Sequence, residues 1–327
     1  MTTQTSGYPP IRQLDGVLFF PVTPFDSAGA VDTGLLTEHI TSRLDHRPGA
    51  VFAACGTGEF HALDLGEVAT VVQTSVTATA GRSPVFGGAG GPLPHAVACA
   101  RAAADAGADG LLVLPPYLVS APAEGLIRYF ETVAEASELP IIVYHRANAA
   151  LTPAAMGRLA RHPKIIGFKD GVGNVDTAQQ IVLEVGDTGR DDFLFFNGLL
   201  TAELTQAAYR GIGIPLYSSA VFAMAPDIAN AFYAAYIARD DVARERLLRE
   251  FYRPLVALRD QVPGYAVALV KAGVRQGGLP VGGVRAPLLD PTPEHEVRLA
   301  DLLARARELT APADPARVVG DLAGSLS

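Results

Sequence analysis

The sequence has few cysteines, no excess of positive charge and no apolar leader. Only two cysteines, Cys55 and Cys99, occur among 327 residues, which argues against the disulfide framework of a secreted protein and indicates a reducing compartment. The net charge of −8 at pH 7 favours neither nucleic acid nor an anionic membrane as a partner. Residues 1–13 lack the basic and apolar regions of a signal peptide and are expected to form a flexible leader. We therefore expect a cytoplasmic protein.

Long apolar runs are also scarce. Residues 212–238 have the length of a membrane span, but they contain Asp227, two prolines and the polar pair Ser218 and Ser219. We interpret this stretch as a buried strand, a turn and a buried helix, and we expect no membrane association.

The apolar residues predict eight short strands that alternate with helices. At 49% hydrophobic residues the chain can form a large core. The expected strands are 16–20, 50–54, 84–88, 110–114, 140–144, 165–169, 193–197 and 212–217. The expected helices are 32–44, 64–80, 93–106, 123–137, 152–161, 175–185 and 201–210.

Strands that alternate with helices indicate parallel βαβ units, and eight of them fit a closed (β/α)8 TIM barrel of the α/β class. An open doubly wound sheet is the main alternative. Neither G-x-G-x-x-G nor a Walker pattern follows any expected strand, and GGAGG at residues 87–91 lacks the spacing.

Further helices follow the eighth strand, at about 226–238, 242–258, 265–275 and 293–309. The expected organisation is a barrel over residues 14–225, a helical C-terminal extension over 226–310 and a flexible tail over 311–327.

The stretch IIGFKDG, residues 165–171, ends an apolar strand in Lys169. An ammonium group at such a place is unfavourable by several kcal/mol unless it is paired or deprotonated. Burial lowers the pKa of an amine, and a neutral amine can form a Schiff base. The alternative is that Lys169 is solvated or paired with Asp170.

Other polar residues also follow expected strands, and the carboxyl ends of the strands carry the active site of a (β/α)8 barrel. They are Thr57, Tyr117, Tyr144, Ser218 and Ser219. Tyr144 could move protons during Schiff-base chemistry, or it could only pack its ring. Thr57 could relay a proton to Tyr144 or hold a carboxylate, or it could only close a turn. The seven histidines show neither H-x-H nor H-E-x-x-H spacing, so no metal site is expected.

Several ordered motifs show a resemblance to a known family. FFPVTPFD, CGTGEF, LPPYL, VYHRAN, IIGFKDGVGN, LYSSAVF and GYAVALVKAG resemble the dihydrodipicolinate synthase and N-acetylneuraminate lyase superfamily over roughly residues 14–310, and its dehydratase branch most closely. The resemblance implies that Lys169 is the Schiff-base lysine and Tyr144 the proton shuttle. It places Thr57 and Gly58 in the substrate-binding loop, and Ser218 and Ser219 near a substrate carboxylate.

Several positions depart from the dehydratase branch, which tends to read YNRDN where this chain reads YHRAN. Arg146 and Asn148 are kept. The departures, which we expect to line the substrate side, are His61, His145, Ala147, Leu200 and Ala223.

The activity implied by the resemblance is the conversion of 5-dehydro-4-deoxy-D-glucarate to 2,5-dioxopentanoate, water and CO₂ by a lyase without a cofactor. Ser218, Ser219, Thr57 and Arg146 are the expected donors to its two carboxylates. Lys271 and Arg285 are weaker candidates, expected to be ordinary surface or interface charges. The alternatives are an aldolase, lyase or synthase acting on another 2-keto acid, and a barrel that binds a sugar acid without catalysis.

The resemblance also implies a homodimer or homotetramer, in which Tyr117 reaches a neighbouring subunit's site. We expect the pair Pro115-Pro116 to direct this loop away from the barrel mouth.

Overall fold

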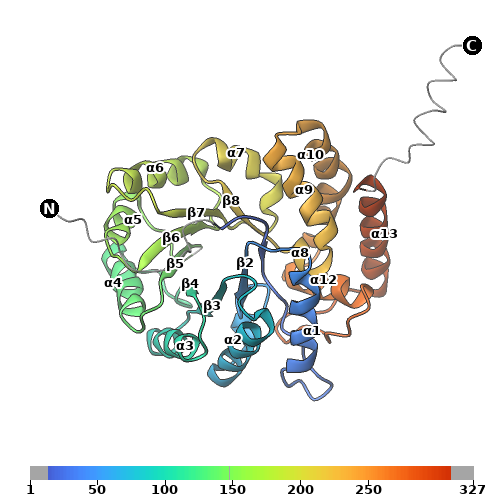
Figure 1. The fold of residues 1–327 in the computed structure, drawn as a ribbon, viewed down its shortest axis with the longest axis horizontal. Helices are drawn as coiled ribbons and strands as arrows, with labels where there is room; N and C mark the ends of the chain where they lie inside the picture. The colour runs from blue at the N-terminus through green and yellow to red at the C-terminus, as the bar shows by residue number, and fades with distance from the viewer. Residues whose placement is uncertain (1–13, 147, 311–327) are drawn as a thin grey trace, which may run out of the picture.

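The structure, a computed structural model, describes residues 14–146 and 148–310, which form a closed barrel of parallel strands (Figure 1). The strands pair in chain order, and the last one closes on the first. They are β1 Leu18–Phe19, β2 Ala50–Ala53, β3 Val85–Ala89, β4 Gly110–Val113, β5 Ile141–His145, β6 Ile165–Asp170, β7 Leu194–Asn197 and β8 Leu216–Ser219. The (β/α)8 barrel predicted from the sequence is confirmed.

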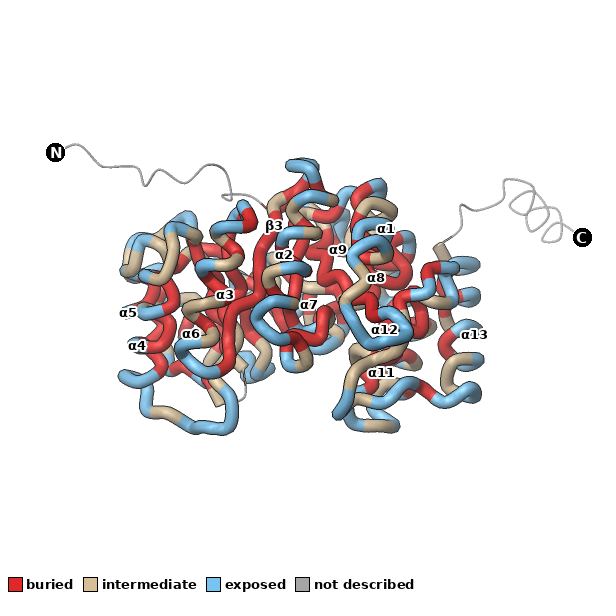
Figure 2. Tube along the Cα trace, turned by 90° about the horizontal axis from the view of Figure 1, so that it is seen from below, coloured by how far each residue is buried: buried red, intermediate tan, exposed pale blue. Residues whose placement is uncertain are grey.

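Helices cover the outside of the barrel, and Figure 2 shows their buried faces against the strands and their exposed faces outward. Local sequence signals define several of them. Asp32 caps the first, where its side chain accepts a hydrogen bond from the Leu35 N–H, and Asp64 and Glu67 form a capping box on the second. The elements are α1 Thr33–Leu44, η1 Phe60–Ala62, α2 Leu65–Thr79, α3 Leu93–Asp105, α4 Ala123–Ala134, α5 Pro153–Ala160, α6 Val175–Gly186, η2 Ala202–Leu204, α7 Gln206–Gly211 and α8 Val221–Met224.

The C-terminal helices lie together on one side of the barrel (Figure 1). They are α9 Pro226–Ala238, α10 Asp241–Leu247, the π-helical turn η3 Leu248–Tyr252, α11 Arg253–Arg259, α12 Tyr265–Gln276 and α13 Pro293–Thr310. The helical stretch expected over 242–258 is present, because residues 241–259 are helical throughout, but a π-helical turn divides it. Pro254 has no N–H to donate to the preceding turn, and a π-helical turn comes immediately before its helix.

The position of the eighth strand also differs from the prediction. Residues 212–215 close α7 instead, because the N–H of Ile214 donates to the Tyr209 carbonyl and Gly213 adopts a φ of +88°. The strand begins after Pro215 and pairs with β1 through Ser218 and Ser219. Both serines therefore belong to the strand end rather than to the loop that follows it.

Three expectations from the sequence concern the terminal segments, the division into domains and membrane association. The expected leader, 1–13, and tail, 311–327, lie outside the described residues. The division between 14–225 and 226–310 stays a prediction. Among residues 14–146 and 148–310, none of the helices combines the length and the hydropathy of a membrane span.

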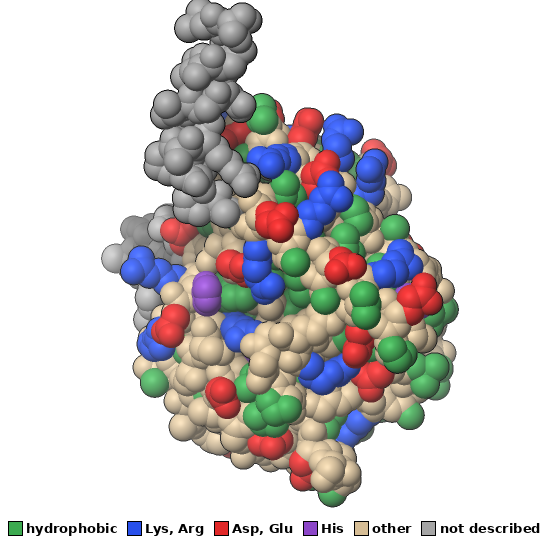
Figure 3. All heavy atoms as spheres, turned by 90° about the vertical axis from the view of Figure 1, so that its right-hand side faces the viewer, with side chains coloured by type: hydrophobic (Ala, Val, Ile, Leu, Met, Phe, Trp, Pro, Cys, Tyr) green, Lys and Arg blue, Asp and Glu red, His purple; other side chains and the backbone are tan. Residues whose placement is uncertain are grey.

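The face over the C-terminal helices carries both signs of charge. Figure 3 shows acidic and basic side chains interspersed on it, and ion pairs join Arg305 to Glu250 and Arg307 to Asp227. Such a surface has no single-sign field that would attract a polyanion.

A buried carboxyl group lies between the barrel and its C-terminal helices. Glu203, in η2, is 2% exposed and accepts a hydrogen bond from the Ser219 hydroxyl at 2.5 Å. Burial raises the pKa of Glu203 to about 7. The folded protein therefore keeps this carboxyl protonated over a pH range in which the unfolded chain ionises it.

This difference predicts a pH-dependent stability that Glu203→Gln should remove. Because the pKa of Glu203 is higher in the folded state, the protonated carboxyl contributes to the free energy of unfolding. This contribution is roughly 3 kcal/mol at most; it is fully present below about pH 4.5 and is lost as the pH rises to about 7. Thermal unfolding of wild type and of Glu203→Gln from pH 5 to pH 8 measures this loss of stability. The stability of wild type should fall relative to Glu203→Gln across this range, and two parallel curves would contradict the prediction.

Candidate active site

Two neighbouring strands place an amine beside a phenol at the barrel mouth. Lys169 near the end of β6 is paired in register with Tyr144 of β5. The Lys169 side chain is 6% exposed, and its Nζ lies 4.3 Å from the centre of the Tyr144 ring and 4.5 Å from that of Phe20. Burial lowers the pKa of Lys169. The arrangement increases the fraction of neutral, nucleophilic amine near neutral pH.

Asp170 does not neutralise this amine. Its carboxylate accepts hydrogen bonds from the N–H groups of Val172 and Gly173 and from the Tyr209 hydroxyl at 2.5 Å. No ion pair joins Asp170 to Lys169 within residues 14–146 and 148–310. The alternative in which Lys169 pairs with Asp170 is therefore wrong, whereas the alternative of a solvated amine stays open, because Lys169 lines a cavity. The glycine turn after Asp170 leads into α6, whose N-cap is Asn174.

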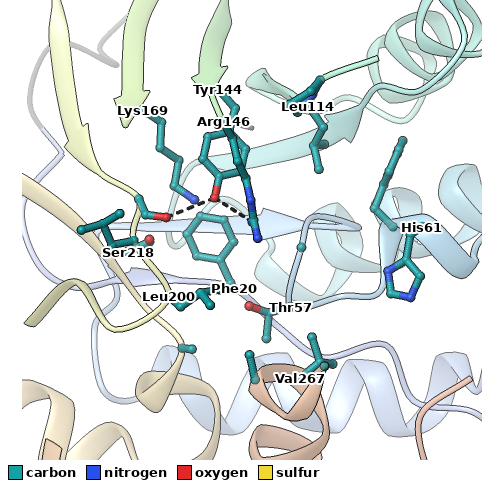
Figure 4. A pocket seen from close by; sticks show the side chains of 18 of the residues that line it. Phe20, Thr57, His61, Leu114, Tyr144, Arg146, Lys169, Leu200, Ser218 and Val267 are labelled. Carbon is teal, nitrogen blue, oxygen red and sulfur yellow. Dashed lines mark hydrogen bonds between the residues drawn. The ribbon is translucent and has the colours of Figure 1, made fainter. Parts of the chain in front are cut away.

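Tyr144 does more than pack its ring. Its hydroxyl donates to the Gly198 carbonyl and accepts from Arg146 Nη1, both at 3.1 Å (Figure 4). The phenol thus has a defined orientation between the lysine and a cationic side chain. A hydroxyl held in this way can give up and recover a proton during chemistry at the lysine.

Two glycines make room for these side chains. A Cβ on Gly198 would lie 2.6 Å from Cγ and 2.7 Å from Cε of Lys169, and a Cβ on Gly171 would lie 2.7 Å from the Tyr144 ring. Both contacts are far closer than van der Waals distance. The glycines therefore allow the lysine and the tyrosine to occupy their present positions.

The amine opens into a cavity of about 480 Å³, a size typical of small-molecule sites. Arg146 supplies its positive charge, Lys169 contributes the amine, and His61 also lies on its wall. No Asp or Glu is among the lining residues in the described part of the chain. In a protein with a net charge of −8, a cavity with only cationic charged groups indicates an anionic ligand.

The structure brings most of the expected site residues together. Thr57, Tyr117 and Ser218 line the same cavity as Lys169, Tyr144 and Arg146. Figure 4 shows Thr57, Ser218, Lys169, Tyr144 and Arg146 on different strands and loops around one opening. The prediction that the loop after the fourth strand points away from the barrel mouth is wrong, because Tyr117 is part of the cavity wall.

Two expected substrate contacts do not line the cavity. Ser219 is fully buried and donates its hydroxyl to Glu203, because successive residues of a strand point to opposite faces and Ser218 takes the inner one. Gly58 is buried, and its carbonyl accepts from the Thr23 hydroxyl at 2.7 Å. Both therefore support neighbouring groups instead of facing the cavity.

The positions that depart from the dehydratase pattern fall into two groups. His61 and Leu200 line the cavity. The expectation that all the departures do so is wrong, because His145 and Ala223 are buried and do not line the cavity, and Ala147 lies outside the described residues. His145 accepts a hydrogen bond from the Leu151 N–H at 3.0 Å.

Lys271 and Arg285 are neither cavity groups nor ordinary surface charges. Lys271 is fully buried and pairs with Glu59 at 2.7 Å. Arg285 pairs with Glu67 and lies over the Phe25 ring. Both cations are already neutralised by carboxylates, so they are not available to a substrate carboxylate.

Sequence reasoning missed two positions beside the amine, Phe20 and Gly198, and it did not predict the contacts of Asn148. Phe20 packs against the amine, and Gly198 contacts both the lysine and the tyrosine. Asn148 donates to the carbonyls of Pro116 and Val119 and so holds the loop that carries Tyr117. Gly198 directly follows the seventh strand, which is the one signal that could have identified it.

A metal centre does not appear among the described residues, where no group of three or more His, Cys, Asp or Glu side chains could hold an ion. The cavity instead presents an amine, a phenol, a guanidinium and hydroxyls.

A closed (β/α)8 barrel with such a cavity at the carboxyl ends of its strands defines the class of TIM-barrel enzymes. The chain belongs to the dihydrodipicolinate synthetase family, whose family model matches residues 13–306.

Within this family, the chain is similar to curated proteins that share one name. The chain is 54% identical to a protein of Streptomyces griseus named "Probable 5-dehydro-4-deoxyglucarate dehydratase", and the match covers 92% of this chain and 94% of that protein. A protein of Paracidovorax citrulli with the same name is 43% identical, with 84% and 90% covered.

Solved structures agree with the fold. Dihydrodipicolinate synthase from Oceanobacillus iheyensis superposes with a TM-score of 0.82 at 23% identity, covering 89% of this chain and 96% of that one. The Aquifex aeolicus enzyme of that name gives 0.79 at 26% identity, with 89% and 98% covered.

The contact between Gly198 and Lys169 generates a prediction. Gly198→Ala should displace the lysine and slow borohydride-dependent labelling of the protein by pyruvate by roughly 10-fold or more, because an error of about 1 Å in a reacting group has effects of this order. Mass spectrometry of the labelled protein measures the rate.

Gly186→Ala is the matched control, because a Cβ at Gly186 would meet no atom within 4 Å. Equal labelling rates for Gly198→Ala and wild type would show that the lysine tolerates the added methyl group.

Proposed function

We propose that this chain is a 5-dehydro-4-deoxyglucarate dehydratase, a lyase that converts 5-dehydro-4-deoxy-D-glucarate to 2,5-dioxopentanoate, water and CO₂. The observation that carries the proposal is the buried Lys169 amine in a cavity whose charged groups are all cationic. The substrate is a sugar diacid with a ketone next to one carboxylate, so it needs both an amine nucleophile and cationic surroundings. The 54% identity to a relative of that name supports the choice of substrate.

The reaction begins at the lysine. The Lys169 nitrogen attacks the ketone, and loss of water gives an iminium that withdraws electrons from its neighbours. Removal of a proton from the adjacent CH₂ forms an enamine, which expels hydroxide from the next carbon. This elimination leaves a carbon–carbon double bond conjugated with the iminium.

Decarboxylation uses the same electron sink. The bond to the far carboxylate breaks, CO₂ leaves, and the electron pair moves through the conjugated system to the nitrogen. Protonation and hydrolysis then release 2,5-dioxopentanoate and restore the amine. The carbon, hydrogen and oxygen atoms of the substrate are all accounted for in the product, one water and one CO₂. The iminium accepts the electrons throughout, so the proposal calls for no cofactor.

The geometry supports a distinct role for each side chain. Tyr144 moves protons to and from the groups attached to the lysine nitrogen, since its ring lies 4.3 Å from Nζ. Arg146 binds a carboxylate and also orients Tyr144, whose hydroxyl it contacts. Thr57 and Ser218 donate from other parts of the cavity wall.

The second candidate is a class I aldolase, lyase or synthase acting on another 2-keto acid. The presence of His61 and Leu200 on the cavity wall is the reason to test this alternative, because both residues depart from the dehydratase pattern. Release of pyruvate instead of CO₂ would identify it. The cytoplasmic location expected from the sequence stays a prediction.

Assembly is part of the proposal, and we propose that the chain forms a homodimer or a homotetramer. Tyr117 is 47% exposed, and Leu118 and Val119 beside it are exposed apolar side chains. A loop tip of this composition gains stability when a second copy covers it. The loop also contributes to the cavity wall, so a neighbouring subunit would complete the site.

The Schiff base is tested by trapping. Incubation with 5-dehydro-4-deoxy-D-glucarate and borohydride should attach an irreversible adduct to Lys169, and Lys169→Ala should abolish CO₂ release without unfolding the barrel. Peptide mapping locates the adduct, and infrared detection measures the gas. An adduct on Lys164 or Lys271 would refute the assignment of the lysine, and labelling at Lys169 without CO₂ would refute the substrate.

The assembly is tested by light scattering together with activity. We expect a mass at least twice the 34.2 kDa of the chain and a specific activity that falls on dilution below the dimer dissociation constant. Leu118→Asp should shift the mass toward the monomer, because a charged side chain at a covered apolar surface is unfavourable by several kcal/mol. A fully active monomer would contradict the proposal.

A further inference from the structure

The turn that carries Thr57 has an unusual backbone. It runs from Gly56 to Glu59 and is closed by the Glu59 N–H, which donates to the Gly56 carbonyl at 3.1 Å. Glu59 adopts a φ of +58°, a left-handed conformation that is unfavourable for a residue with a Cβ. Other contacts must therefore hold Glu59 in place.

The Glu59 side chain supplies those contacts. It is fully buried, and its Oε1 lies 2.7 Å from Lys271 Nζ while its Oε2 accepts from the Arg285 N–H at 2.8 Å. Lys271 Nζ also donates to the Gly283 carbonyl at 2.7 Å and lies 4.0 Å from the centre of the Phe25 ring. The ion pair thus joins the Thr57 turn to α12 and to the segment that follows it.

The same helix forms part of the cavity wall. Ala266 and Val267 of α12 line the cavity, and Figure 4 shows Val267 beside Thr57. Val267 and Lys271 are four residues apart, so they lie on the same face of the helix. The ion pair therefore joins two elements that both contribute to the wall, the Thr57 turn and α12.

Stability alone gives little reason for this pair. Removing two charges from water is expensive, and apolar replacements of similar volume are often as stable as a buried ion pair. The pair does, however, impose one geometry, because breaking it leaves an uncompensated charge in the interior.

We propose that Glu59 and Lys271 are positioning residues that hold Thr57 at a set distance from α12 and so shape the part of the site that receives a carboxylate of the substrate. This inference rests on the proposed function for the identity of that substrate. It assigns a role to Lys271 that involves no contact with the substrate.

A double-mutant cycle between Glu59→Gln and Thr57→Val tests the inference. Glu59→Gln keeps the size of the side chain and an acceptor for the Arg285 N–H but removes the charge. If Glu59 acts through Thr57, the substitution should raise the pyruvate concentration for half-maximal borohydride labelling of Lys169 roughly 10-fold in wild type, and less than about twofold in the Thr57→Val background. The maximal labelling rate should change less.

The matched control is Glu67→Gln. It breaks the ion pair between Glu67 and the Arg285 side chain, which anchors the segment that follows α12. Within the described residues, the Glu67 carboxylate does not contact the Thr57 turn. This variant should lower the unfolding temperature and leave the labelling curve unchanged. An equal effect of Glu59→Gln in both Thr57 backgrounds would overturn the inference, because the ion pair would then affect only the fold.

Glu59→Gln combined with Lys271→Met keeps the test decisive if the single variant unfolds. The combined variant contains no unpaired buried charge, and it should show the same dependence on Thr57. Labelling by pyruvate also separates this inference from the proposed function, because it requires the Lys169 amine and not the dehydration. If pyruvate labels the protein normally but no CO₂ is released, the proposed substrate is refuted. The double-mutant cycle can still be measured in that case.

Discussion

The burial of a single amine determines how the rest of the barrel mouth is arranged. Lys169 is the penultimate residue of β6 and has aromatic rings on two sides, from Phe20 and Tyr144. An ammonium ion in such surroundings loses much of its hydration, so the equilibrium moves toward the neutral amine. The adjacent main chain must also approach closely, which explains why glycine occupies position 198.

The same constraint governs the acidic side chains nearby. Three buried carboxyl groups lie around the site, and each faces away from the cavity toward partners of its own. Asp170 accepts from two backbone N–H groups and a tyrosine, Glu59 pairs with Lys271, and Glu203 accepts from Ser219. Since any one of these carboxylates would stabilise the ammonium form of Lys169 or repel an anionic substrate if it faced the cavity, their orientation keeps the cavity cationic.

The C-terminal helices take part in the site as well as in the core. Through α12 they contribute Ala266 and Val267 to the cavity wall, and through Lys271 they hold the turn before η1. The segment that follows α12 adds Arg285, whose side chain pairs with Glu67 of α2. The Thr57 turn therefore contacts the C-terminal helices through Glu59 as well as the barrel, where the Thr23 hydroxyl donates to the Gly58 carbonyl.

The sequence by itself determined the order of strands and helices and the closed barrel, and it predicted that Lys169 and Tyr144 lie near the ends of neighbouring strands. These follow from local patterns, because apolar runs, capping residues such as Asp64 and turn residues act over a few positions. The start of β8, the π-helical turn at 248–252 and the orientation of Ser219 could not be predicted in this way. Each depends on which hydrogen bonds the neighbouring elements offer, as the contact of Ser219 with Glu203 shows. Only the tertiary structure decided that Lys271, 212 positions after Glu59 in the chain, would pair with it, because a contact between distant segments depends on how the whole chain packs.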